Sequence, residues 1–179
     1  MTTTKEKIKV LDEELKGKVK DLIDLKIKTN KNSRDRNLKN KLKDEYKSFM
    51  ESILNKISSE DILISNLDIE EFIEPEGICE GVATGITFKR TQLRKFFAEV
   101  KLISEKNKGE QINSIDITKL IPKLAYSQAR GLIDNHFFQF MKSLLEKVRR
   151  TKSKEDYENF VDIFEAIVAY HYYYNPKED

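Results

Sequence analysis

Apolar residues recur at helical spacing between Thr87 and Lys106, and no other feature of the sequence constrains the fold more strongly. Over TFKRTQLRKFFAEVKLISEK, a period of 3.6 residues per turn gathers five apolar side chains on one face: Leu93, Phe96, Phe97, Val100 and Ile103. Thr87 stands where a side-chain oxygen can accept from the free N–H groups of a first turn. The stretch therefore predicts an amphipathic core helix with Thr87 as its N-cap.

Three cations lie beside that apolar face. Spacings of four and seven residues bring Arg90, Arg94 and Lys101 to nearly the same azimuth on a helix, and we call them the first cationic stripe. Lys89 and Lys95 are their sequence neighbours. This helix is thus expected to bury one face and to present positive charge along its flank.

The composition extends the helical prediction to the rest of the chain. The 179 residues include three prolines and six glycines, and 36% of them are charged. Long charged side chains lose little rotamer freedom in a helix, and few helix breakers interrupt them. The sequence shows neither an internal repeat nor a long strand-like alternation. We therefore expect an all-α protein, and a chain of this length can bury one sizeable core.

Three absences narrow the class of protein. No apolar run approaches the roughly 20 residues that cross a bilayer, and the first residues, MTTTKEKIKV, lack the apolar core of a signal peptide. The single cysteine, Cys79, cannot form an internal disulfide or supply a structural zinc site. We expect a cytoplasmic protein with no membrane contact, no metal and no cofactor.

Helical spacing divides the chain into an N-terminal unit, residues 1–58, and a helical-bundle unit, residues 59–179. In the first unit two amphipathic helices, 5–28 and 42–57, flank a polar joint in which Ser33 is a candidate cap. A basic helical hairpin or arm is expected there, and a hairpin on such a joint could exchange between copies. The second unit is expected to be a compact bundle of about five helices.

Breakers set the expected ends of the bundle helices. Pro75 suits the first turn of a short helix that Gly85 closes. A later helix begins at Asp116, and Pro122 in its interior requires either a late start or a kink. Gly131 ends that helix as a C-terminal cap should. The other expected helices are 87–106, 133–150 and 154–174.

The net charge of +2 conceals strong segregation along the chain. The formal charge is +6 over residues 1–59, −8 over 60–86, +10 over 87–154 and −6 over 155–179. A block of +10 matches the electrostatic footprint of a protein that binds a polyanion. Charged runs also mark faces that meet only water, so charge alone leaves both interpretations open.

The helix expected at 116–131 repeats the cationic pattern. If this helix is continuous, Lys119, Lys123 and Arg130 fall on one side, and we call them the second cationic stripe. Two adjacent helices with such stripes could line one groove. The candidate RNA-binding residues are the two stripes, with Lys89 and Lys95 added in second rank.

The chemical inventory offers little for catalysis. His136 and His171 are the only histidines, and the sequence lacks HExxH, GxSxG, a cysteine cluster and a Gly-rich phosphate loop. His171 lies at a core spacing, which favours a buried structural histidine. Cys79 has no basic neighbour in its segment that would make its thiol reactive. Tyrosines 170 and 172–174 are expected to close one end of the core, although such rings can also stack on bases. We assign no catalytic residue.

Three pieces of the sequence resemble the small-subunit family of type III-A CRISPR effector complexes, the Csm complexes. They are TQLRKFFAEV (91–100), IPKLAYSQARG (121–131) and FEAIVAYHYYY (164–174), in the order and at the separations of that family. The most distinctive parts are Ala125–Tyr126, followed by Arg130, and the terminal Ala169–His171. The similarity covers roughly residues 60–175 and does not explain residues 1–58.

The resemblance implies a small all-α bundle without catalytic activity. Members of this family stack in several copies along a ribonucleoprotein filament and help to hold target RNA paired to CRISPR RNA. The partners implied are the CRISPR RNA–target RNA duplex or single-stranded target RNA, the other subunits of the complex, and copies of the chain itself. The positions that match the family's basic motif are Arg94, Lys95, Lys123 and Arg130. Phosphate contacts that ignore sequence suit a subunit that must accept any target.

Two other functions fit parts of the sequence. The chain could be a helical protein–protein scaffold in which the basic block meets acidic segments of a neighbouring copy. It could also be an enzyme that uses His136 or a cluster of carboxylates. That cluster, which we interpret first as an acidic surface for a basic partner, is Glu70, Glu71, Glu74 and Glu76.

Overall fold

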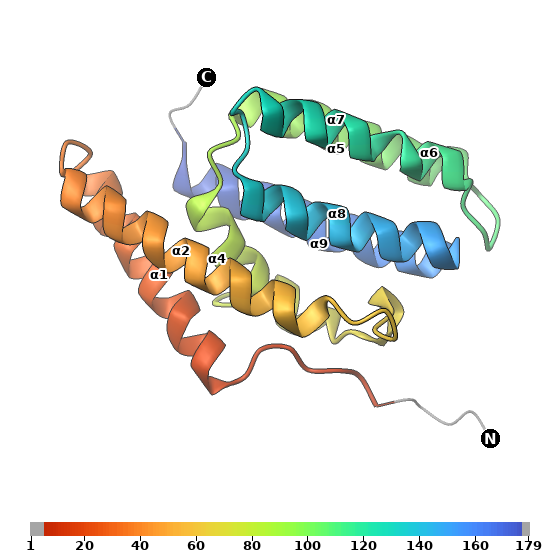
Figure 1. Ribbon diagram of the computed structural model, residues 1–179, viewed down its shortest axis with the longest axis horizontal. Helices are drawn as coiled ribbons and strands as arrows, with labels where there is room; N and C mark the ends of the chain where they lie inside the picture. The colour runs from red at the N-terminus through yellow and green to blue at the C-terminus, as the bar shows by residue number, and fades with distance from the viewer. Residues whose placement is uncertain (1–5, 177–179) are drawn as a thin grey trace.

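Helices follow one another through residues 6–176, which are the residues that the computed structural model describes (Figure 1). The α-helices in this range are α1 Glu13–Lys31, α2 Arg36–Ile57, α3 Ile69–Ile73, α4 Ile78–Gly85, α5 Arg90–Lys106, α6 Ser114–Thr118, α7 Leu120–Ala129, α8 Asn135–Thr151 and α9 Lys154–Tyr174. A 3-10 turn, η1, covers Ile64–Asn66. Strand pairing in residues 6–176 is limited to isolated bridges, so the all-α prediction is confirmed.

The bundle has more helices than the five expected. Between residues 59 and 176 the chain forms α3 to α9, because α3 is additional and the helix expected at 116–131 is broken at Lys119. Pro122 lies in the first turn of α7, where its missing N–H removes no helical hydrogen bond. The interruption predicted from Pro122 is therefore confirmed. Lys119 precedes the helix that carries Lys123, and Arg130 directly follows that helix.

The N-terminal unit folds as the expected helical hairpin, but its first helix starts later than the sequence suggests. Residues 6–12 form no helix, and α1 begins at Glu13 because the Asp12 carboxylate accepts the N–H of Leu15 at 2.9 Å. Lys5, the expected start, lies outside the described residues. A carboxylate cap fixes a helix end more strongly than the apolar spacing that precedes it.

Three other helix ends also correct the sequence prediction. Asp35, and not Ser33, caps α2, because its carboxylate accepts the N–H groups of Asn37 and Leu38 at 2.9 and 3.1 Å. Lys89 occupies the N-cap position of α5, so Thr87 caps nothing. Pro75 lies in the turn ahead of α4, outside the first helical turn. Ser33 and Asp35 are neighbours of similar capping type, and spacing alone does not choose between them, whereas α4 and α5 begin without a side-chain cap.

Glycine closes two helices as predicted. Gly131 follows α7 with φ of +68°, a left-handed conformation that glycine adopts without strain, and donates its N–H to the carbonyl of Gln128 at 2.9 Å. Gly85 is the last residue of α4, and a Cβ there would lie 2.2 Å from ring atoms of Tyr46. The missing side chain lets the end of α4 approach α2 closely.

One buried cluster joins the long helices of both units. It includes Phe49 from α2, Leu93 from α5, Phe137 from α8 and Phe164 from α9. Figure 1 shows α5, α6 and α7 along one side of α8 and α9, with α1 and α2 on the other side and α4 between. The division of the chain at residue 58 stays a prediction. None of the helices in residues 6–176 is both long and apolar enough to cross a bilayer.

The first described residues are fixed to the segment around α3. Ile8 forms a bridge to Leu67 through two backbone hydrogen bonds. The carboxylate of Glu71, which is only 7% exposed, accepts the N–H of Val10 and, at 3.2 Å, the N–H of Leu11. We call this arrangement the Glu71 clasp. It ties the start of the hairpin to the chain that follows the hairpin.

Candidate nucleic-acid interface

A groove of about 430 Å³ lies between α5 and α7, and we call it the α5–α7 groove. Apolar, aromatic and charged side chains line it: Phe88, Gln92, Lys95, Phe96, Glu99, Pro122, Lys123, Tyr126, Ser127, Arg130 and Leu132. Tyr126 is 62% exposed, so its ring is open to solvent. Two neighbouring helices therefore do line one groove, and α5 contributes its Lys95 side rather than the first cationic stripe.

Three cations meet in the α5–α7 groove. Lys95 is exposed, and Lys123 forms an ion pair with Glu99 across the groove. The guanidinium of Arg130 lies 5.4 Å from the centroid of the Tyr126 ring and donates to the Tyr126 hydroxyl at 3.3 Å. A guanidinium can hold phosphate oxygens, and an exposed ring beside it can stack on a base. The groove thus combines both kinds of contact that an unpaired RNA strand accepts.

The first cationic stripe lies along the opposite edge of α5. Arg90 lies over the ring of Tyr172, 4.1 Å from its centroid, and donates to the carbonyl of Pro176 at 3.0 Å. Lys101 lies 3.8 Å from the carboxylate of Glu165 on α9. These two cations face α9 and the residues after it, so they stabilise the packing of α5 on α9.

The remaining candidates are exposed and do not line the α5–α7 groove. Arg94 is exposed on α5, Lys89 is exposed just before that helix, and Lys119 is exposed at the break between α6 and α7. The α5–α7 groove therefore collects only part of the set that the sequence suggests. That these residues bind RNA stays a prediction.

The two side chains considered for reactivity, His171 and Cys79, are buried. His171 is 1% exposed, and burial, followed by the positive charges of Lys26 and Arg90, lowers its pKa from 6.5 to about 4. The Cys79 thiol lies 3.4 Å from the carbonyl of Ile163, and burial raises the pKa of this thiol. The structural interpretation of both residues is confirmed, because neither reaches solvent as a base or a nucleophile.

The other catalytic candidates are also dispersed. His136 lies 3.4 Å from Glu51 and 3.9 Å from Asp134, and the side chains of His136 and Asp134 are each 25% exposed. Glu71 is not part of an exposed acidic cluster, because its carboxylate is buried in the Glu71 clasp. Within residues 6–176 no group of three or more His, Cys, Asp and Glu side chains is placed to hold a metal ion. Of the terminal tyrosines, Tyr174 is buried at the end of the core, as the sequence suggests, whereas Tyr173 is 73% exposed and contradicts that expectation.

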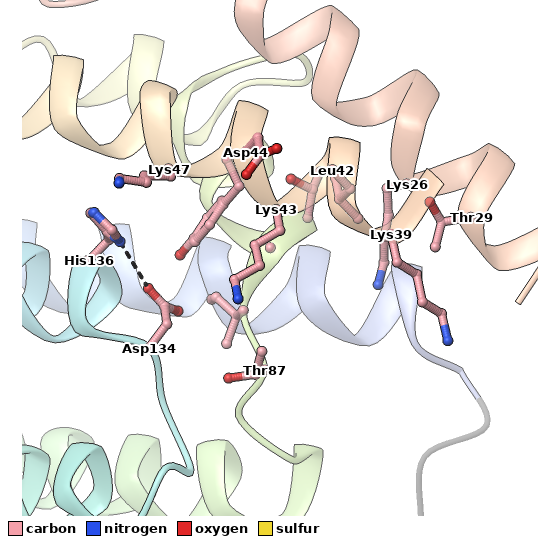
Figure 2. Close-up of a pocket in the computed structure, with 14 residues that line it drawn as sticks. Lys26, Thr29, Lys39, Leu42, Lys43, Asp44, Lys47, Thr87, Asp134 and His136 are labelled. Atoms are coloured by element: carbon pink, nitrogen blue, oxygen red, sulfur yellow. Dashed lines mark ion pairs between the residues drawn. The ribbon is translucent and has the colours of Figure 1, made fainter. Parts of the chain in front are cut away.

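Sequence reasoning missed a second cavity, which we call the hairpin pocket. It holds about 450 Å³ where α1, α2, the end of α4 and the start of α8 meet (Figure 2). Lys39, Lys43 and Lys47 line it at four-residue spacing along α2. That spacing is a third cationic stripe and was visible in the sequence. The opposite wall includes Asp134, which is far away in the chain and shares no pattern with α2.

The structure defines a small all-α protein with a cationic groove, and a comparison with family models gives its class. Residues 75–177 match the family model described as Csm2 type III-A. The chain belongs to this family, the small subunit of type III-A CRISPR-Cas complexes, which confirms the resemblance seen in the sequence. The matched range runs from the turn before α4 and includes both walls of the α5–α7 groove. No curated protein and no solved structure matches this chain.

Proposed function

We propose that this small subunit holds RNA without catalysing a reaction, and that it does so through the α5–α7 groove. In this proposal several copies stack along a cytoplasmic ribonucleoprotein complex, next to its other subunits, and contact target RNA that is paired to CRISPR RNA. The observation that carries the proposal is the meeting of Lys95, Lys123 and Arg130 beside the exposed ring of Tyr126. Family membership supports the setting, because the chain is a subunit of such a complex.

The chemistry of the groove suits contacts to the RNA backbone. Ammonium and guanidinium groups bind phosphate oxygens whatever the neighbouring base is, so they fix the position of a strand and carry no sequence information. Where a base of the strand is unpaired, a tyrosine ring can stack on it whatever its identity, because every base has a π face. The subunit would then accept any target, and base pairing with the guide would supply the specificity.

The Glu99 carboxylate competes with phosphate for the ammonium group of Lys123. This carboxylate neutralises Lys123 in the free protein, so an incoming phosphate must displace it. Both partners are about half exposed, at 54% and 42%, so the ion pair costs little to break. Removing the Glu99 charge should therefore strengthen RNA binding, which is the opposite of the effect expected for any cation in the groove.

The test is binding of the purified full chain to an unrelated single-stranded RNA and to its duplex over a range of salt concentrations. For Lys95→Ala/Arg130→Ala we expect the slope of log K against log salt to fall by about 1.4, since each phosphate contact on a single strand contributes about 0.7. Glu99→Gln should tighten binding by a few-fold. Lys16→Ala removes an exposed lysine on α1, outside the groove, and serves as the control, with no expected change.

The outcomes separate this proposal from its rivals. Loss of affinity that is equal for all RNA sequences supports phosphate contacts, whereas loss for one sequence alone contradicts them. Absence of binding at low salt would mean that the groove faces protein. Self-association that ignores RNA and disappears at high salt would then favour the scaffold function.

A further inference from the structure

Phosphate binding explains the cations of the α5–α7 groove but does not explain Glu99. Of the described residues that line the groove, Glu99 alone is acidic. Its side chain is 42% exposed and forms an ion pair with Lys123, whose side chain is 54% exposed. An ion pair this exposed contributes little to stability, so a structural link between α5 and α7 is a weak explanation for the carboxylate. A carboxylate also repels phosphate, and its presence therefore points to a second kind of ligand group.

Glu99 lies where a strand bound to the cations must pass. Lys95 precedes it by one turn of α5, and the four-residue spacing places both side chains along the same edge of that helix. Lys123 reaches it from α7, on the other wall of the groove. The carboxylate is thus flanked by two ammonium groups, and a backbone whose phosphates bind both of them passes close to it.

The backbone of a nucleic acid offers a carboxylate one kind of hydrogen-bond donor. Phosphate oxygens and the sugar ring oxygen accept hydrogen bonds, and so does a carboxylate. The 2′-hydroxyl of ribose can donate, and DNA lacks this group. In RNA the 2′-hydroxyl is attached to the carbon next to the one that carries the 3′-phosphate. A donor and an anion are therefore neighbours on RNA, as an acceptor and a cation, Glu99 and Lys123, are neighbours in the groove.

We propose that Glu99 selects RNA over DNA by accepting a hydrogen bond from a ribose 2′-hydroxyl while Lys123 binds the adjoining 3′-phosphate. This inference rests on the proposed function, that the groove binds RNA, and adds the residue that distinguishes the two nucleic acids. When RNA enters, the ion pair between Glu99 and Lys123 opens and each partner gains a new one. When DNA enters, Lys123 gains a phosphate, but Glu99 loses its cation and faces that phosphate without a donor.

Binding of the full chain to three single-stranded decamers tests the proposal. One is made of uridine, one of 2′-deoxyuridine and one of 2′-fluoro-uridine, so the base is the same in all three. The 2′-fluoro strand keeps an RNA-like sugar shape but has no 2′ donor. At one salt concentration the wild type should bind the uridine strand about 5- to 10-fold more tightly than either of the others. This range is at the low end for a hydrogen bond to a charged group, because the site is half exposed.

Variants of two carboxylates on α5 assign the preference to Glu99. Glu99→Ala removes the acceptor and the charge, so it should tighten binding of the 2′-deoxy and 2′-fluoro strands about 5-fold and change uridine binding by less than about 2-fold. The RNA preference should then nearly disappear. Glu99→Gln keeps an acceptor and should retain part of the preference. Glu105→Ala removes an exposed carboxylate of α5 that does not line the groove and is the matched control, with no expected change in the preference.

The outcomes separate this inference from the proposed function. Equal binding of the uridine and 2′-deoxyuridine strands by the wild type overturns the inference. So does a preference for RNA that survives Glu99→Ala, that is lost equally in Glu105→Ala, or that extends to the 2′-fluoro strand. In each of these cases the proposed function stands, provided that Lys95→Ala/Arg130→Ala weakens binding of the uridine strand. If no strand binds at low salt, the proposed function itself fails, and this inference fails with it.

Discussion

The buried His171 should make the stability of the protein depend on pH in the mildly acidic range. Its imidazole is 1% exposed, its Nδ1 has no partner within the described part of the chain, and Lys26 and Arg90 add positive charge nearby. Each of these features disfavours the protonated form in the folded protein, and a hydrogen bond with the Phe88 backbone opposes them only in part.

The sign and size of the effect follow from the two pKa values. The unfolded chain takes up a proton on this histidine near pH 6.5, whereas the folded chain does so only near a pKa of about 4. The unfolded state therefore binds more protons between those values, and the stability present above pH 6.5 is lost as the pH falls towards 4. Between pH 8 and pH 5 the loss from His171 alone is about 2 kcal/mol.

Urea denaturation followed by far-ultraviolet circular dichroism at pH 8, 7, 6 and 5 measures this loss. Carboxylates also titrate near the lower end, so the informative quantity is the difference between the wild type and His171→Phe. The variant cannot take up a proton at this site, and we expect its stability to change by about 2 kcal/mol less between pH 8 and pH 5. Equal pH profiles for both proteins would refute the reasoning, because a neutral buried imidazole could not then be the cause.

Two further predictions concern packing and use matched controls in denaturant titrations. Gly85→Ala places a Cβ 2.2 Å from the Tyr46 ring and should cost about 1–3 kcal/mol, whereas Gly17→Ala, in the interior of α1 with nothing within 4 Å, should stabilise by about 0.5–1 kcal/mol. If both changes act alike, the close approach at Gly85 is not limiting. Lys147 is 3% exposed and donates to two carbonyls of the loop after α2 at 2.7 and 2.8 Å. Lys147→Met should cost about 1–3 kcal/mol. Lys142→Met removes one partly exposed ion pair on the same helix and should cost less than about 0.5 kcal/mol. Similar losses for the two variants would contradict this difference.

Periodicity predicted the parts of the fold that depend on one helix at a time. The expected bounds of α9 agree with the structure, and the apolar face of α5 that contains Leu93 and Val100 is the buried face. Pro122 and Gly131 predicted a break and an end because proline and glycine act on the local backbone. Such effects need no knowledge of neighbouring helices.

Features that depend on two elements were not predictable in this way. The azimuth of Arg90 and Lys101 on α5 was correct, but the sequence does not say that α9 lies on that side and α7 on the other. Glu71 stands in an acidic segment, and nothing local distinguishes it as a buried acceptor for the N–H of Val10. The sequence did not predict the hairpin pocket for the same reason, because Tyr46 and Asp134, which both line it, belong to segments with unrelated patterns.

The Glu71 clasp joins the two ends of the segment that contains the hairpin, residues 10–71. The hydrogen bonds that fasten it join residues 61 and 60 positions apart, and α1 and α2, which lie between those residues in the sequence, pack against α4 and α8. Neither helix can leave the bundle alone, since the clasp and the core contacts must open together. We therefore expect any exchange of hairpins between copies to occur while chains fold and not between folded ones. A monomer and a hairpin-exchanged dimer, once formed, should stay distinct on dilution, so the history of a preparation and not its concentration would determine which form is present.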